Sequence, residues 1–168
     1  MNTVQTLNYV VNFFWTIIGF LPLTIYWWQT PLTFSFYCFL MVSVFLANVP
    51  ERMIHQFRFS SKRRIYELVG VRLVRKFVQD GDYIRKGNHW VRSKAAAEKY
   101  LLRILMYERF HTLCFLFFTF SMTHALLNAR IKLGLMILFC NVFFNVYPLL
   151  LQQYNRLRIL RLIEKGQT

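Results

Sequence analysis

A carboxylate and an imidazole stand three residues apart where a basic part of the chain meets an apolar one, at Glu108 and His111. On a helix, this spacing places both side chains on one face. Ionisable groups at membrane depth are costly unless they have a partner, so such a pair is more often functional than one on a soluble surface. In one interpretation, Glu108 orients His111 while the imidazole removes a proton from a hydroxyl group. In the other, the pair is a hydrogen-bonded anchor for the helix end, and spacing alone does not separate the two.

A second polar set follows in a segment rich in Leu, Phe and Val. Its members recur every three to four residues, which places them in one stripe along a helix: Asn141, Asn145, Pro148 and Gln152. The stripe leads into Tyr154, Asn155, Arg156 and Arg158. The amides are suited to hydrogen bonds between helices. The arginines are suited either to lipid phosphates at a membrane surface or to bidentate contacts with the phosphates of an acyl-coenzyme A.

Apolar helices are the elements that must position these residues. Residues 1–50 contain no Asp, Glu, Lys or Arg, and at about twenty residues per crossing this stretch could traverse a bilayer twice. A break at 29–31 separates predicted crossings at 7–28 and 32–49. Two later apolar segments, on either side of Arg130 and Lys132, predict crossings at 110–129 and 131–152. The sequence therefore predicts a single all-α membrane domain over residues 1–168, with about four transmembrane helices.

Positive charge is concentrated between the second and third predicted crossings. Residues 51–109 hold fifteen of the twenty-one Lys and Arg residues, and the tail from Arg156 holds four more. Because short loops rich in Lys and Arg tend to stay in the cytoplasm, we expect a multi-pass protein of the cell membrane. The insert at 50–109, the tail at 153–168 and both termini should be cytoplasmic, where anionic membrane lipids are neighbours. No nucleic-acid partner is expected, since the charge lies between and beside apolar spans.

The cytoplasmic insert has a pattern of its own. Apolar residues recur at helical spacing over 61–79 among several Lys and Arg residues, which predicts a basic amphipathic helix lying in the membrane interface. A turn at 80–82 and a small hairpin at 83–92 are expected next. From Ser93 a strong helix start runs without a breaker towards 110–129, so one long helix should connect the insert to the third crossing.

Three motifs in order carry a resemblance to a known family. They are Gly70-x-Arg72-x-x-x-Lys76-x-x-x-Asp80-Gly81, then Glu108-x-x-His111, then Asn145-x-Tyr147-Pro148-x-x-x-Gln152-x-Tyr154-Asn155-Arg156-x-Arg158. Together they resemble the small membrane acyltransferases typified by glycosyl-diaponeurosporenoate acyltransferase of carotenoid biosynthesis. That protein esterifies a sugar hydroxyl of a carotenoid glycoside with a fatty acyl group. One departure is Gln153, which stands where the family pattern has a basic residue.

The resemblance implies a membrane-embedded O-acyltransferase that moves a fatty acyl group from an activated donor, such as acyl-coenzyme A, to a hydroxyl of a lipid or glycolipid acceptor. It implies that His111 is the general base and that Glu108 fixes its tautomer. Basic side chains would position the anionic donor: Arg72, Lys76, Arg156 and Arg158. An amide of Asn145, Gln152 or Asn155 would donate to the developing oxyanion, while Asp80 and Tyr154 belong to the same substrate-binding set.

A different class of function fits the same residues. The chain could be a non-catalytic membrane protein that binds anionic lipid or organises a membrane complex through its basic insert, with the Glu108 and Asn145 regions serving as packing features. Acyl transfer that depends on His111 separates the two hypotheses. No metal and no resident cofactor are expected in either case, and the oligomeric state stays open.

Overall fold

The computed structural model describes residues 3–31, 33–56, 58–74 and 94–164. In these ranges the regular elements are all helices, as the predicted fold class requires. They are α1 (Thr3–Gln29), α2 (Phe34–Ala47), α3 (Glu51–Gln56), α4 (Arg63–Leu68), α5 (Val71–Val74), α6 (Lys94–Leu127), α7 (Ile131–Asn141), the π-helical segment η1 (Val142–Val146) and α8 (Tyr147–Glu164). The turn expected at 80–82 and the hairpin expected at 83–92 lie outside the described residues.

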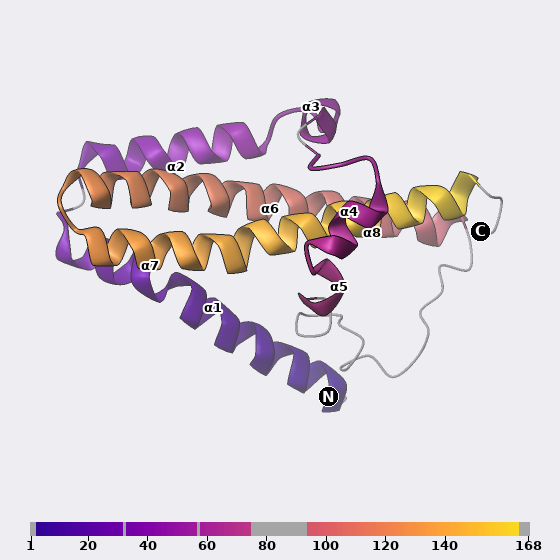
Figure 1. The fold of residues 1–168 in the computed structure, drawn as a ribbon, viewed down its shortest axis with the longest axis horizontal. Helices are drawn as coiled ribbons and strands as arrows, with labels where there is room; N and C mark the ends of the chain where they lie inside the picture. Colours follow the sequence, from indigo (N-terminus) through magenta and orange to yellow (C-terminus); the bar gives the residue numbers. More distant parts are fainter. Residues whose placement is uncertain (1–2, 32, 57, 75–93, 165–168) are drawn as a thin grey trace.

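Helix α6 is the centre of the arrangement. It contacts α2, α7 and α8, and the continuous run from α7 through η1 to α8 returns antiparallel along its whole length (Figure 1). Helix α1 packs on α7 and diverges from the others towards its N-terminus, while α4 and α5 lie on α8. The predicted long helix that joins the insert to the apolar segment at 110–129 is confirmed, because α6 runs without interruption over 34 residues.

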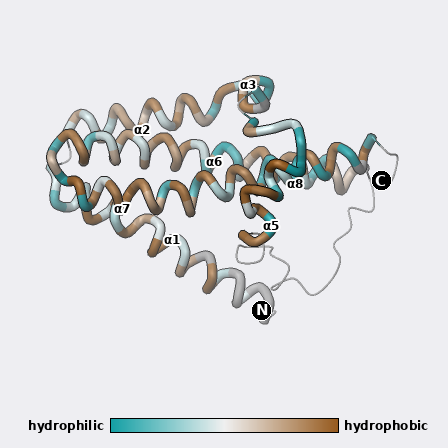
Figure 2. The backbone as a smooth tube through the Cα atoms, in the orientation of Figure 1, coloured by the Kyte–Doolittle hydropathy of each residue, from teal (hydrophilic) through white to brown (hydrophobic). Residues whose placement is uncertain are grey.

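Three helical stretches are long and apolar enough to cross a bilayer: Tyr9–Gln29, Ala95–Leu127 and Ile131–Arg161. They overlap the first, third and fourth predicted crossings, and Figure 2 shows many apolar residues along α7 and along α6 near the turn that joins them. The second predicted crossing, 32–49, differs. Helix α2 has only 14 residues, which is about 21 Å at 1.5 Å per residue and less than the hydrocarbon core of about 30 Å.

Large aromatic side chains fill the core at the end of the molecule where α6 turns into α7. Tyr26 and Trp27 of α1 pack with Phe118 of α6 and Ile137 of α7, and all four are almost fully buried. On the outer faces of these helices, by contrast, large apolar side chains remain exposed, as Phe13 and Phe139 illustrate at 69% and 61%. A surface of this kind is suited to lipid rather than to water.

The prediction of one continuous amphipathic helix over 61–79 is wrong. The chain forms α4, then a break at Gly70, then α5, and residues 75–79 lie outside the described part. Gly70 has φ +83°, a left-handed conformation that a continuous right-handed helix does not contain and that glycine adopts readily. The break also changes the buried face, because Tyr66 and Val71 are buried against α8 while Leu68 and Leu73 are exposed.

A π-helical turn interrupts the return helix at η1. Its cause lies in Pro148, which has no N–H to donate to the carbonyl of Phe144 four residues earlier. The wider turn is shown by the Tyr147 N–H, which donates to the carbonyl of Val142, five residues back. This local change was not predicted from the sequence, and it rotates the residues before Pro148 relative to those after it.

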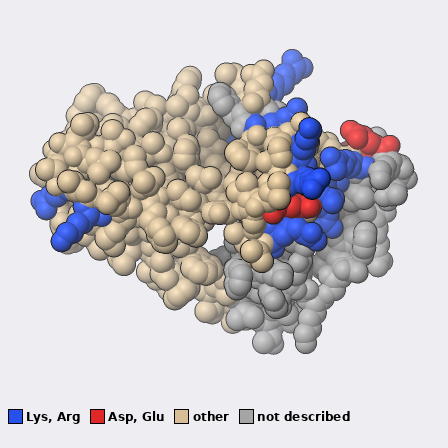
Figure 3. Space-filling view, viewed as in Figure 1, with Lys and Arg blue, Asp and Glu red and all other residues tan. Residues whose placement is uncertain are grey.

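Basic side chains collect at one end of the molecule. Figure 3 shows Lys and Arg gathered over α3, α4 and α8, and a second small group at the opposite end beside the turn between α6 and α7. Between them, the described residues on this face show no charge over the long apolar body. The two groups therefore lie at the two ends of the apolar helices. This arrangement agrees with a helix bundle whose middle is surrounded by hydrocarbon.

Candidate functional site

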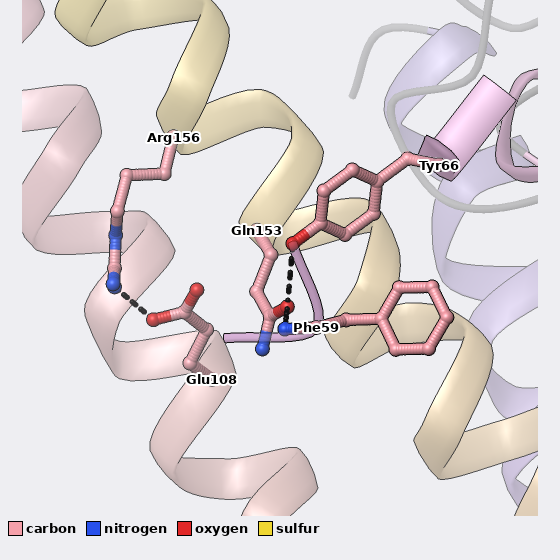
Figure 4. Close-up of polar contacts among 5 residues, drawn as sticks. All are labelled: Phe59, Tyr66, Glu108, Gln153 and Arg156. Atoms are coloured by element: carbon pink, nitrogen blue, oxygen red, sulfur yellow. Dashed lines mark hydrogen bonds and ion pairs between the residues drawn. The ribbon is translucent and has the colours of Figure 1, made fainter. Parts of the chain in front are cut away.

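An ion pair joins α6 to α8 at the boundary between the apolar body and the basic end. Nη2 of Arg156 binds Oε2 of Glu108 (Figure 4). The Glu108 side chain is 2% exposed and that of Arg156 is 12% exposed, so the carboxylate is the more deeply buried partner. The second oxygen, Oε1 of Glu108, is also buried and has no hydrogen-bond partner among the described residues. Burial of a carboxylate at this position is therefore compensated mainly by one guanidinium.

A chain of buried amides links η1 to α6. Nδ2 of Asn141 donates to the carbonyl of Phe115 at 3.1 Å and to Oγ1 of Thr119 at 3.0 Å. Because a backbone carbonyl can only accept, these contacts fix which end of the Asn141 amide is nitrogen. Its Oδ1 then accepts from Nδ2 of Asn145 at 2.9 Å. The orientation of the Asn145 amide is determined in turn, and its oxygen is left to act as an acceptor.

The imidazole of His111 lies against the end of this chain. It interacts with the side chain of Asn145 and with the backbone carbonyl of Phe144, whose helical donor is removed by Pro148. Nδ1 of His111 is buried and, within the described ranges, has no hydrogen-bond partner. Because that atom and Oε1 of Glu108 are both in this condition, they do not bond to each other. Glu108 pairs with Arg156, and the role of Glu108 in orienting His111 stays a prediction.

Two tyrosines dock α4 and the segment before it on α8. Tyr154 donates to Oε1 of Glu67 at 3.1 Å, and the same carboxylate accepts from Arg63 at 3.0 Å. Tyr66 lies 3.0 Å from Oε1 of Gln153, which also accepts from the N–H of Phe59 at 2.9 Å (Figure 4). These contacts hold the start of the insert beside the Glu108–Arg156 ion pair.

Comparison with models of protein families gives a match over most of the chain. The model of the glycosyl-4,4'-diaponeurosporenoate acyltransferase family, CrtO, matches residues 50–165, which is more than half of the chain. The chain belongs to this family. Neither the curated proteins nor the solved structures contain a significant match to it. The matched range begins just before α3 and includes every residue of the ion pair, the amide chain and the α4 contacts.

Only part of the residue set implied by the CrtO resemblance comes together in the structure. Glu108, His111, Asn145 and Arg156 lie where α6 meets η1 and α8, and Tyr154 is buried against α4. Gln152 and Asn155 are partly exposed on α8, and Arg72 on α5 and Arg158 on α8 are exposed. Lys76 and Asp80 lie outside the described residues, so their placement stays a prediction.

The structure brings three further residues to this end: Arg58, Tyr66 and Gln153. The sequence analysis did not name Arg58 or Tyr66, and it noted Gln153 only as a departure from the family pattern. Gln153 carried a signal, because it departs from the basic residue of the family pattern. The structural role of Gln153 could not be predicted from the sequence, because its two hydrogen-bond partners, the Phe59 N–H and the Tyr66 hydroxyl, are distant in the chain. Tyr66 gave no signal, because it fell off the apolar face expected for an uninterrupted helix.

Proposed function

We propose that this chain is a membrane-embedded O-acyltransferase that moves a fatty acyl group from an activated donor, such as acyl-coenzyme A, to a hydroxyl of a lipid or glycolipid acceptor. Membership of the glycosyl-4,4'-diaponeurosporenoate acyltransferase family supports the reaction class. The apolar outer faces of α1, α6 and α7 support a lipid acceptor, which would reach the site from the side rather than from water.

The environment of His111 is the observation that carries the proposal. Nδ1 of His111 has no hydrogen-bond partner among the described residues, whereas the oxygen of Asn145 and the carbonyl of Phe144 are acceptors beside the ring, so a proton on the other ring nitrogen would be held there. Nδ1 then holds a lone pair. A neutral imidazole with one fixed N–H and one lone pair is the form that a general base requires.

In the proposed reaction, the acceptor hydroxyl gives its proton to the lone pair of His111 as its oxygen attacks the carbonyl carbon of the donor thioester. The carbon–sulfur bond breaks, the thiolate takes the proton from His111, and an ester of the acceptor remains. Because Asn145 donates to Asn141, the remaining candidates to stabilise the oxyanion are the partly exposed amides of Gln152 and Asn155. Glu108 acts as a positioning residue that holds Arg156.

Access to His111 requires a side chain to move. Nδ1 is buried in this arrangement, and the ring of Phe110 packs edge-on against the imidazole with centroids 5.2 Å apart. Phe110 is itself 54% exposed on the outside of α6. Phe110 is therefore our candidate for the side chain whose movement would expose the imidazole.

The test is acyl transfer by the purified full-length chain, with labelled acyl-coenzyme A and a membrane lipid extract. We expect His111→Ala and His111→Asn to lose at least about a hundredfold in rate, the usual contribution of a positioned base. His124→Ala is the matched control, because His124 also lies on α6 but packs at the opposite end against Trp27. Unchanged transfer in the folded His111 variants would remove this residue from the mechanism. Absence of transfer from every donor and lipid fraction would favour a non-catalytic lipid-binding protein.

A further inference from the structure

Helices α4 and α5 present an apolar surface that points away from the bundle. Four apolar side chains of this segment are exposed: Ile65 and Val69 at 36%, Leu68 at 77% and Leu73 at 62%. Positions 65, 68 and 69 follow the i, i+3, i+4 spacing, so their side chains share one face of α4. The other side of α4 is held on α8 by Tyr66, which is buried, and by Glu67, which accepts from Tyr154.

Positive charge borders this apolar face. Residues 51–74 hold six Lys and Arg residues against two Glu residues. Glu67 is engaged by Arg63 within α4, and the charge of Glu51 acts on Arg156 of α8. The exposed cations of the segment are Arg58, Lys62, Arg64 and Arg72. Arg64 precedes Leu68 by one helical turn, so it flanks the apolar face. Apolar faces flanked by Lys and Arg are typical of helices that lie in a membrane interface and attract anionic lipids.

The direction of this segment also suits a membrane surface. Helices α6, α7 and α8 run along the long axis of the molecule, whereas the chain from α4 to α5 runs across it (Figure 1). Along that axis the segment lies level with the start of α1 (Figure 1) and where the apolar body gives way to Lys and Arg (Figure 3). A segment that crosses the axis of membrane-spanning helices at their end lies parallel to the plane of the bilayer.

The small size of the surface favours lipid over a protein partner. A stable protein interface buries about 800 Å² on each side, which is more than the exposed side chains of two short helices provide. Contact with a bilayer has no such requirement here, because the long apolar helices already hold the chain in the membrane and the contacts of Tyr66 and Glu67 already fix α4 on α8. A few apolar side chains are then sufficient for shallow insertion.

We propose that α4 and α5 form a contact with the surface of an anionic bilayer. Leu68 and Leu73 enter the boundary between headgroups and acyl chains, while Arg64 and Arg72 bind anionic headgroups of the same leaflet. Because α4 is fixed on α8, this contact also sets the depth at which the Glu108–Arg156 ion pair lies in the membrane. The contact does not require acyl transfer, so the two proposals can fail separately.

Bimane fluorescence from single cysteines tests the contact in the full chain, reconstituted into vesicles of phosphatidylcholine and phosphatidylglycerol. Leu68→Cys and Leu73→Cys carry the label at exposed positions, so the fold should tolerate it. Arg161→Cys is the matched control, because Arg161 is an exposed residue near the end of α8. All variants also carry Cys38→Ser, since Cys38 is partly exposed whereas Cys114 and Cys140 are buried.

Lipids with brominated acyl chains should quench the label at positions 68 and 73 at least about threefold more than at position 161, and aqueous iodide should give the reverse order. Brominated phosphatidylglycerol should quench the label at position 68 more than brominated phosphatidylcholine does.

Arg64→Gln should lower this preference by up to about fivefold, the effect of one positive charge near an anionic surface. Iodide quenching as strong at positions 68 and 73 as at 161, without quenching by brominated chains, overturns the proposal and assigns the face to a water-soluble partner. Equal quenching by the two brominated lipids overturns the role given to the arginines.

Discussion

The Glu108–Arg156 ion pair predicts an asymmetric loss of stability when either partner is removed. Arg156→Met leaves a carboxylate that is 2% exposed and whose Oε1 already lacks a partner among the described residues. Glu108→Gln leaves a guanidinium that is 12% exposed, so part of its charge can be solvated. The arginine substitution should therefore be the more damaging of the two.

The magnitudes follow from the burial of the two groups. Removing one partner of a buried ion pair costs about 3–5 kcal/mol, and we expect Arg156→Met to lie in this range. Loss of a charge-assisted hydrogen bond costs about 1.5–3 kcal/mol, which is the range expected for Glu108→Gln. Replacement of both residues, as in Glu108→Gln with Arg156→Met, should restore most of the stability because no buried charge remains.

Thermal unfolding of the purified chain in a mild detergent measures these differences. In a chain of this length 1 kcal/mol corresponds to about 2–4 °C in Tm, so Arg156→Met should lower Tm by at least about 6 °C. Arg158→Met is the control, because Arg158 lies two residues further along α8 and is exposed. Equal shifts for Arg156→Met and Arg158→Met, or a double variant no more stable than the sum of its single changes, would refute the reasoning.

Three further predictions concern the helices that hold the site. Pro148→Ala supplies an N–H for the carbonyl of Phe144 and should favour a regular α-helix there, so acyl transfer should fall while Tm does not; unaltered transfer would show that the π-turn has no part in the site. Gly70→Ala should destabilise the fold by about 1–2 kcal/mol in thermal unfolding, because φ is +83° and an L side chain disfavours this conformation. No other described atom lies within 4 Å of the added carbon, so the cost is that of the backbone alone, and an unchanged Tm would contradict this. Tyr154→Phe removes the 3.1 Å hydrogen bond to Glu67 and should cost about 1 kcal/mol by the same assay, against no loss if that contact contributes nothing.

The long helices could be predicted from the sequence because a bilayer imposes a strong constraint on composition. A stretch of about twenty residues without Asp, Glu, Lys or Arg is rare in a water-exposed helix, and α1 and the helices around the turn at 128–130 follow that rule. The uninterrupted α6 was also predictable, since nothing between Ser93 and Leu127 breaks a helix. Apolar content alone overestimated the length of α2: the prediction was 32–49, and the helix is Phe34–Ala47.

The site was less predictable because its contacts join separate motifs. Glu108 and Arg156 could each be singled out, but their pairing depends on the register between two antiparallel helices, which neither motif encodes. The π-turn shifts that register again, and Pro148 indicates only that one hydrogen bond is missing. Near Tyr66, a single left-handed residue at Gly70 redirected the apolar face, so a periodic pattern that continues through a glycine predicted the wrong side.

The position of the ion pair along α6 has a consequence for substrate size. From Glu108 to Leu127 the helix rises by about 29 Å, close to the thickness of one hydrocarbon core. A molecule whose polar group reaches Arg156 can therefore extend a fully stretched acyl tail beside α6 without meeting charge before the turn at Arg130. Under the proposed function, the length of α6 beyond Glu108 would match the thickness of the bilayer, and membranes of unusual thickness would shift His111 relative to the lipid headgroups.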